Sequence, residues 1–177
     1  MGKYEGFFIR LLFAVFLAFL GSGITSMNIF YITFSWWTFH LSSFVFSLFH
    51  EVIAVAPVFV VDGQIIELIP ACVAASAYLL LALLILLTRG ISLKKGLMMF
   101  FWGSVLILVA NVIRMEILVS LLLNNNINYF ASLHLLLWKI VSSVYVAAVW
   151  IFLCWTFHVK NIPVYSDVQS FLHVKRK

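Results

Sequence analysis

Hydrophobic positions in this chain form long blocks that short polar connections separate. Four blocks are long enough for a helix that crosses the hydrocarbon core of a bilayer, which takes about 20 residues. They lie at about residues 7–27, 71–88, 97–123 and 129–157. The pattern predicts an all-α polytopic membrane protein with about four transmembrane helices, in one membrane domain over residues 1–177.

The first block also has features of a signal peptide. A basic end comes before an apolar core, and Gly21-Ser22-Gly23 follows that core. The apolar stretch continues beyond this point, and no clear A-x-A cleavage site follows. We therefore expect a retained first span, with cleavage as the alternative.

A further apolar stretch at residues 36–56 differs from the spans because it contains His40, His50 and Glu51. We expect an amphipathic helix that lies at the outer membrane surface. If this helix spans the membrane instead, the N-terminus moves outside, and the placement of everything after Pro57 is unchanged.

The pattern changes again between Pro57 and Pro70, where β-branched residues flank Asp62-Gly63. An Asp-Gly pair in this setting is the strongest short-range signal for a β-hairpin. A short hairpin over residues 58–68 is therefore expected before the Cys72 helix. Because hydrocarbon cannot satisfy the edges of two strands, the hairpin should lie at the membrane surface and pack on protein.

Composition supports the membrane assignment. Hydrophobic residues make up 65% of the 177 positions and charged residues 10%, whereas a soluble domain carries about 25% charged residues. These values exclude a soluble globular domain, a disordered chain and a nucleic-acid binder, despite the net charge of +5.

The basic residues indicate an orientation. Three lie in the connection between the spans at 71–88 and 97–123, and four lie in the tail at 158–177. Because Lys and Arg are enriched on the cytoplasmic side, both segments are expected inside a cell membrane. The connection at 124–128 contains no Lys or Arg, so it and the hairpin are expected outside.

Three reactive side chains are expected at a similar depth. From the nearest basic residues on the inner side, the helical rise places Cys72 at roughly 25 Å, Arg114 at roughly 28 Å and His134 at roughly 39 Å. All three therefore lie at or near the outer boundary of the bilayer. The second cysteine, Cys154, lies near the opposite end of its span, so a disulfide between the two is not expected.

These three residue types suit thiol chemistry. The thiolate is the nucleophile, a guanidinium stabilises nearby negative charge, and a histidine moves protons near neutral pH. Cys72 follows Pro70 and Ala71 at an expected helix start, where free backbone N–H groups favour an anion. Arg114 could instead hold the oxyanion of a tetrahedral intermediate.

Other residues could support or replace these roles. Asn111 shares a helix face with Arg114 and could orient it, while Arg114 could instead pair with Glu116 or Glu67. Lys139 either snorkels outward or sits in the site. A charge inside an apolar span is by default a functional hypothesis.

Metal and cofactor chemistry have no support in the spacing of residues. His40 and His50 do not have metal-ligand spacing, and there is no CxxC motif. We therefore expect no metal and no cofactor.

His50 and Glu51, on the expected outer helix, could supply an acid or base.

Three segments together resemble the exosortase/archaeosortase family, with a form that looks more like its archaeal branch. They are Glu67–Ser76 (ELIPACVAAS), Asn111–Arg114 (NVIR) and Leu133-His134. The resemblance covers roughly Pro57 to Ser142. The chain is shorter than many members, and it has His134 where some archaeal members have Arg.

The resemblance implies a membrane-embedded cysteine transpeptidase or protease without a cofactor. Cys72 would be the nucleophile, Arg114 the stabilising cation and His134 the acid or base. Its partners would be surface proteins with a C-terminal motif, a transmembrane helix and a basic cluster. The product would pass through a thioester to a membrane lipid or another anchor.

Two other functions remain open on the sequence. A small transporter or channel subunit would bind an anion at Arg114 and Lys139. A non-catalytic membrane scaffold would leave Cys72 inert.

Overall fold

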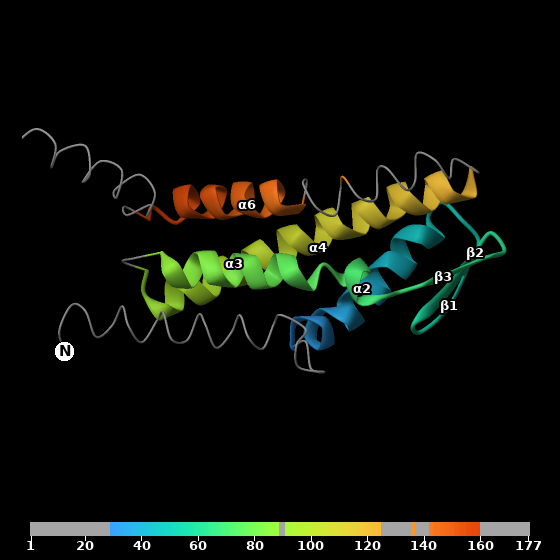
Figure 1. Cartoon of the computed structure of the whole chain (residues 1–177), viewed down its shortest axis with the longest axis horizontal. Helices are drawn as coiled ribbons and strands as arrows, with labels where there is room; N and C mark the ends of the chain where they lie inside the picture. The colour runs from blue at the N-terminus through green and yellow to red at the C-terminus, as the bar shows by residue number, and fades with distance from the viewer. Residues whose placement is uncertain (1–28, 89–90, 125–135, 137–141, 160–177) are drawn as a thin grey trace, which may run out of the picture.

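The computed structural model describes residues 29–88, 91–124, 136 and 142–159. This part of the chain is mostly helical and carries one small sheet (Figure 1). Its elements are α2 (Ile29–Ser47), β1 (Val52–Val55), β2 (Val58–Val61), β3 (Gln64–Glu67), the 3-10 turn η1 (Pro70–Val73), α3 (Ala75–Leu87), α4 (Leu93–Leu123) and α6 (Ser142–Thr156).

Several predicted features lie outside the described residues. They are the span at 7–27, the beginning of the span at 129–157, His134, Lys139 and the basic tail from residue 160 onward.

The longest helix is α4, with 31 residues, or about 46 Å at the rise of an α-helix. Within the described residues it is the one helix long and apolar enough to cross a membrane. Its start is capped by Ser92, whose hydroxyl accepts a hydrogen bond from the backbone N–H of Lys95 at 3.4 Å. The helices α3 and α6 are apolar but shorter.

The predicted outer helix at 36–56 is wrong in its bounds. Helix α2 ends at Ser47, and residues Val52–Val55 form strand β1. A short apolar run with β-branched residues cannot be assigned to helix or strand by periodicity alone. Here the strand is favoured because β1 pairs with β2 along its full length.

The predicted hairpin at 58–68 is present, but it is part of a three-stranded antiparallel sheet in the order β1-β2-β3. Asp62 and Gly63 make the expected tight turn, with φ angles of 48° and 81°. Positive φ at both central residues is what a type I′ turn requires. The third strand, β1, covers one edge that a two-stranded hairpin would leave open.

One face of the sheet packs on the helices. Phe59 and Val61 of β2 are fully buried and join Phe46 of α2 and Val119 of α4 in one apolar cluster. The sheet therefore lies at the end of the molecule where α4 ends (Figure 1).

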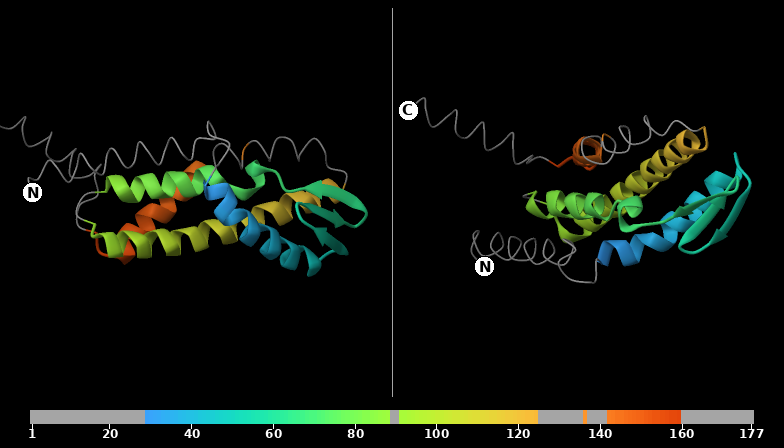
Figure 2. Two further views of the ribbon diagram at one scale, coloured as in Figure 1. Left: turned by 90° about the horizontal axis from the view of Figure 1, so that it is seen from below. Right: turned by 45° about the vertical axis from the view of Figure 1, so that its right-hand side comes forward.

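A second apolar cluster lies between α3, α4 and α6, which run alongside one another (Figure 2). Gly103 of α4 permits their close approach. A Cβ at this position would lie 2.6 Å from Cδ2 of Leu81 in α3 and 2.9 Å from Cδ1 of Leu153 in α6.

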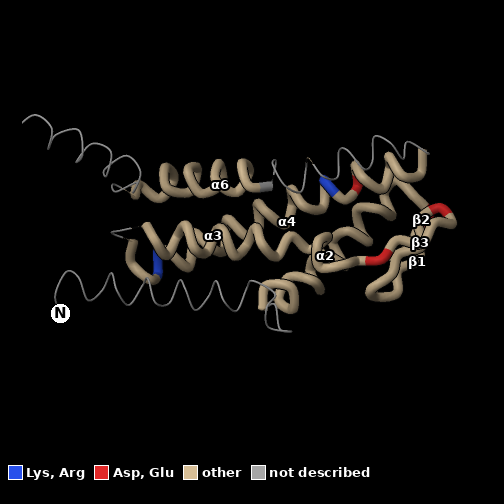
Figure 3. The backbone as a smooth tube through the Cα atoms, viewed as in Figure 1, with Lys and Arg blue, Asp and Glu red and all other residues tan. Residues whose placement is uncertain are grey.

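The acidic residues of the sheet lie at the opposite end of the described structure from the basic start of α4, although a further basic position lies on α4 in the half nearer the sheet (Figure 3). Lys94 and Lys95 lie in the first turn of α4, whereas Glu51, Asp62 and Glu67 belong to the sheet and its turns. The basic end and the acidic end are therefore opposite ends of the described structure.

Candidate functional site

Cys72 lies on the 3-10 turn η1, between the sheet and α3, and is half-buried. Its N–H donates to the carbonyl of Ile69 at 2.8 Å. The expectation that Cys72 begins the following helix is wrong, because α3 starts three residues later. Ala74, with φ 55°, separates the turn from the helix.

Two side chains of α4 hold this turn. Asn111 donates from Nδ2 to the carbonyl oxygen of Cys72 at 2.7 Å. Arg114 donates from Nη2 to the carbonyl oxygen of Ala71 at 3.2 Å. Because Asn111 and Arg114 lie three positions apart, they share one face of the helix. They thus bind consecutive carbonyls of the turn that carries the thiol.

The guanidinium also lies near the thiol. Arg114 is mostly buried, and it lies close enough to the side chain of Cys72 to interact electrostatically. The structure therefore brings together three of the residues singled out in the sequence: Cys72, Asn111 and Arg114.

A cavity of about 180 Å³ opens beside these residues. Asn111 and Arg114 line it together with apolar side chains of three helices. Nε of Arg114 and Oδ1 of Asn111 are both buried, and neither has a hydrogen-bond partner within the described structure. The residues that hold the Cys72 turn thus also border a mostly apolar space.

The thiol itself does not line this cavity. Ala74 and Ala77, which follow Cys72 on the turn and on α3, form its nearer wall. The cavity is thus a neighbouring space that Arg114 connects to the Cys72 turn.

Arg114 makes no ion pair with Glu116 or Glu67 in the described part of the chain. Glu116 binds His50 instead, and Glu67 is exposed at the end of β3. The two alternatives for a structural ion pair of Arg114 are therefore wrong. For Glu116 the physical reason is direction, because positions two apart on a helix point to different faces.

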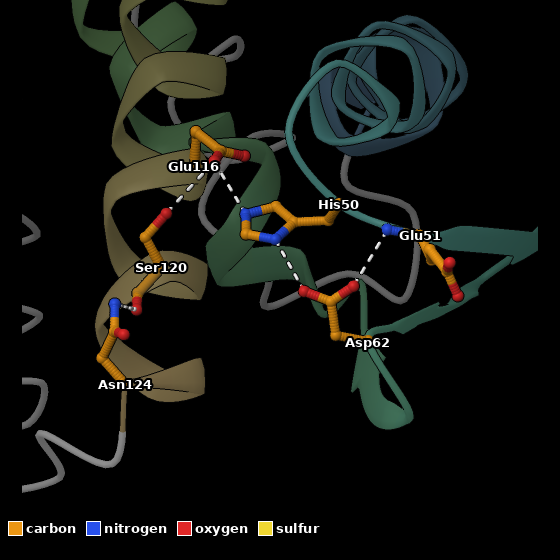
Figure 4. Close-up of polar contacts among 6 residues, drawn as sticks. All are labelled: His50, Glu51, Asp62, Glu116, Ser120 and Asn124. Carbon is orange, nitrogen blue, oxygen red and sulfur yellow. Dashed lines mark hydrogen bonds and ion pairs between the residues drawn. The ribbon is translucent and has the colours of Figure 1, made fainter.

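A second polar cluster ties the sheet to α4 (Figure 4). His50 lies between two carboxylates, with Nδ1 at 2.8 Å from Asp62 Oδ2 and Nε2 at 3.1 Å from Glu116 Oε1. Ser120 donates to the same oxygen of Glu116 at 3.1 Å. The N–H of Glu51 donates to Asp62 Oδ1 at 2.9 Å.

These contacts set the charge of His50. Burial disfavours the charged imidazole, but hydrogen bonds to Asp62 and Glu116 outweigh it and raise the pKa of His50 above its ordinary value of 6.5. The hydrogen bond from the Glu51 N–H, followed by that from His50, lowers the pKa of Asp62 below 3.8. The two carboxylates therefore favour the protonated form of His50.

Sequence reasoning named His50 and Glu51 but missed Asp62 and Glu116 as their partners. His50 is 12 positions from Asp62 and 66 from Glu116. No local spacing connects them, and only the pairing of the hairpin with β1 brings them together. The one available signal was Glu116, a carboxylate inside an apolar helix.

Two predicted site residues, His134 and Lys139, lie outside the described residues. Both cysteines are free, and Cys154 is buried in α6. Among the residues that the structure describes, no group of three or more His, Cys, Asp or Glu side chains could hold a metal ion.

Comparisons of the chain with protein-family models, curated proteins and solved structures gave no match. The site comprises a thiol on a turn that α4 binds, a mostly buried guanidinium beside it, and a neighbouring cavity that Asn111 and Arg114 line.

Proposed function

We propose that the protein is a multi-pass membrane cysteine transpeptidase or protease that acts at the outer face of the cell membrane. It cleaves a C-terminal sorting signal and passes the product to a lipid or another anchor. The observation that carries this proposal is the pair of hydrogen bonds from Asn111 and Arg114 to the turn that bears Cys72.

The location proposed for the site rests on the length and charge of α4. We propose that the basic start of α4 is cytoplasmic, with four spans in the chain and the C-terminus inside. Arg114 lies 19 residues beyond Lys95 on one continuous helix, a rise of about 28 Å. A hydrocarbon core is about 30 Å thick, so this rise supports a site near the outer boundary.

A substrate of matching topology would meet the site there. A secreted protein with a C-terminal membrane helix and an inner basic cluster presents the residues before that helix at the outer boundary. The resemblance to the exosortase/archaeosortase family supports the same substrate class.

The reaction proceeds in two balanced steps. The thiolate of Cys72 attacks a peptide carbonyl carbon and forms the C–S bond, and the peptide C–N bond then breaks as His134 gives a proton to the leaving amine. An amine, a lipid hydroxyl or water then attacks the thioester. That nucleophile gives its proton to His134, and the C–S bond breaks.

Arg114 acts as the fixed cation of this reaction. Its guanidinium stabilises negative charge on the sulfur before attack and on the carbonyl oxygen during it.

The test uses a tagged substrate. A secreted protein that ends in a short motif, an apolar helix and a Lys/Arg cluster receives a C-terminal tag. It is then co-expressed with the wild type, with Cys72→Ala and with the matched control Cys154→Ala. We expect loss of the tag with the wild type and the control, and none with Cys72→Ala. Full processing by Cys72→Ala would refute the proposal.

A second candidate function is a membrane subunit that binds an anion. It is favoured by a buried Arg114 that lines a cavity and has no ion pair among the described residues. Anion flux in liposomes that survives thiol alkylation and is lost in Arg114→Gln would support it. Flux that is absent in the wild type would exclude it.

A further inference from the structure

Strand β3 forms one edge of the sheet, because the strand order is β1-β2-β3. The N–H of Leu68 donates to the carbonyl of Pro57 at 2.8 Å, so Leu68 faces β2. In an antiparallel pair, the N–H and C=O groups of successive residues point alternately toward and away from the partner strand. The N–H and C=O groups of Gln64 and Ile66 therefore point toward β2 as well. The N–H and C=O groups of Ile65 and Glu67 point away from the sheet.

This edge is open within the described structure. No hydrogen bond joins the main chain of Ile65 or Glu67 to any described residue on the outer side. Ile65 is 76% exposed. An open edge of this kind pairs with another extended chain.

The edge leads directly to the thiol. Glu67 is followed by Leu68 and by Ile69, which keeps an extended backbone with φ −87° and ψ 163°. The carbonyl of Ile69 then accepts the N–H of Cys72. A chain that lies along β3 is thereby directed to Cys72.

We propose that the free edge of β3 binds the substrate, as an extended polypeptide segment that adds a fourth strand to the sheet and brings its scissile bond to Cys72. This inference rests on the proposed function. Main-chain hydrogen bonds supply affinity in this binding mode, and alternate side chains supply specificity.

The sheet also indicates which side chains the segment carries. Ile53, Val60 and Ile65 are paired across the three strands on the face away from the helices, and Ile53 is 66% exposed. A fourth strand extends this row with an apolar side chain. Because Glu67 borders the edge and the strands carry no Lys or Arg, the segment is neutral or basic.

The opposite edge provides the matched control. The N–H of Asp62 donates to the carbonyl of Glu51. Because backbone groups alternate along a strand, the N–H and C=O groups of Val52 and Ala54 on β1 point away from β2. That edge runs from the His50 cluster to the Pro57 turn and does not continue to Cys72.

Proline substitution tests the two edges of the sheet separately, since proline removes one N–H and is tolerated where that group faces outward. In the tagged-substrate assay, Ile65→Pro is expected to lower the rate at limiting substrate by about tenfold or more. Ala54→Pro should retain the wild-type rate. Alkylation of Cys72 by iodoacetamide should be unchanged in both. Wild-type processing by Ile65→Pro would overturn the inference and leave the proposed function standing, whereas no processing by the wild type would overturn both.

A crosslinking experiment covers the case in which Ile65→Pro does not fold. A photoreactive amino acid is placed at Glu67 or at Ala54 in the Cys72→Ala background, and the membranes are illuminated with the tagged substrate present. A crosslink from position 67 and none from position 54 supports the inference. Equal crosslinks, or none from position 67, overturn it.

Discussion

The amide of Asn111 donates a 2.7 Å hydrogen bond to the carbonyl oxygen of Cys72, which lies 39 positions earlier in the chain. This bond fixes the turn that carries the thiol against α4, the longest helix. The position of the sulfur therefore depends on α4 as much as on its own segment.

Removal of this bond should weaken both fold and site. Asn111→Leu leaves the Cys72 carbonyl without its partner, and we expect a loss of about 1–3 kcal/mol in the free energy of unfolding. Processing of the tagged substrate should also slow. The control is Asn124→Leu, which removes a bond to Ser120 at the exposed end of α4. Equal effects of the two substitutions would show that Asn111 has no special role.

The guanidinium of Arg114 should not be replaceable by another cation. Arg114→Lys keeps the charge but loses the planar set of donors that reaches both the Ala71 carbonyl and the cavity. We expect processing to fall by about 100-fold or more, the usual loss for one oxyanion donor. Lys94→Gln, at the far end of α4, is the control. Near-normal processing by Arg114→Lys would contradict this prediction, because it would show that a positive charge alone is sufficient.

The His50 cluster should make stability depend on pH. Because the folded-state pKa of His50 is raised above 6.5, its contribution is present below about pH 6.5 and is lost as the pH rises through the raised value. The lowered pKa of Asp62 gives stability the opposite dependence on pH. Its contribution is present above about pH 3.8 and is lost as the pH falls through the lowered value.

Thermal unfolding in detergent from pH 5 to pH 9 measures the His50 contribution. The midpoint difference between the wild type and His50→Gln should be largest at acidic pH and shrink toward pH 9. A difference that stays constant with pH would contradict this, because it would mean that folding does not shift the pKa of His50. Glu116 and Asp62 face His50 in the described residues, so both are kept unchanged.

Close packing of α3, α4 and α6 should depend on Gly103. A Cβ there meets Leu81 and Leu153 at less than 3.0 Å, so Gly103→Ala should cost about 1–3 kcal/mol through overpacking. Gly96→Ala is the matched control because its Cβ meets ordinary contacts at 3.5 and 3.6 Å. Removal of a helix-interior glycine should leave that variant as stable as the wild type or stabilise it by about 0.5–1 kcal/mol. Equal stability of Gly103→Ala and Gly96→Ala would contradict this packing.

Sequence patterns predicted those features that depend on local chemistry. The hydrophobic pattern predicted a helical chain with about four transmembrane helices. The described residues confirm the mostly helical chain and contain one helix, α4, that is long and apolar enough to cross a membrane. Asp62-Gly63 predicted the turn, because only residues that tolerate positive φ fit there. Spacing on one helix face suggested that Asn111 orients Arg114. In the structure the two side chains instead bind separate carbonyls of the Cys72 turn.

Features that depend on distant pairing were not predicted. Strand β1 was assigned to a helix because its partner, β2, decides its conformation. The contact between Glu116 and His50 joins positions 66 apart, so no local signal existed. The 3-10 turn at Cys72 forms because α4 binds its carbonyls, which the local sequence does not encode.

The most direct test of the account is the mass of the peptide that contains Cys72 during turnover. Membranes with the wild type and the tagged substrate are quenched in acid, digested and analysed by mass spectrometry. The account predicts a substrate fragment joined to Cys72 Sγ as a thioester, released by neutral hydroxylamine and missing in Cys72→Ala. Processing that continues in Cys72→Ala, with no adduct on Cys72 in the wild type, would contradict it.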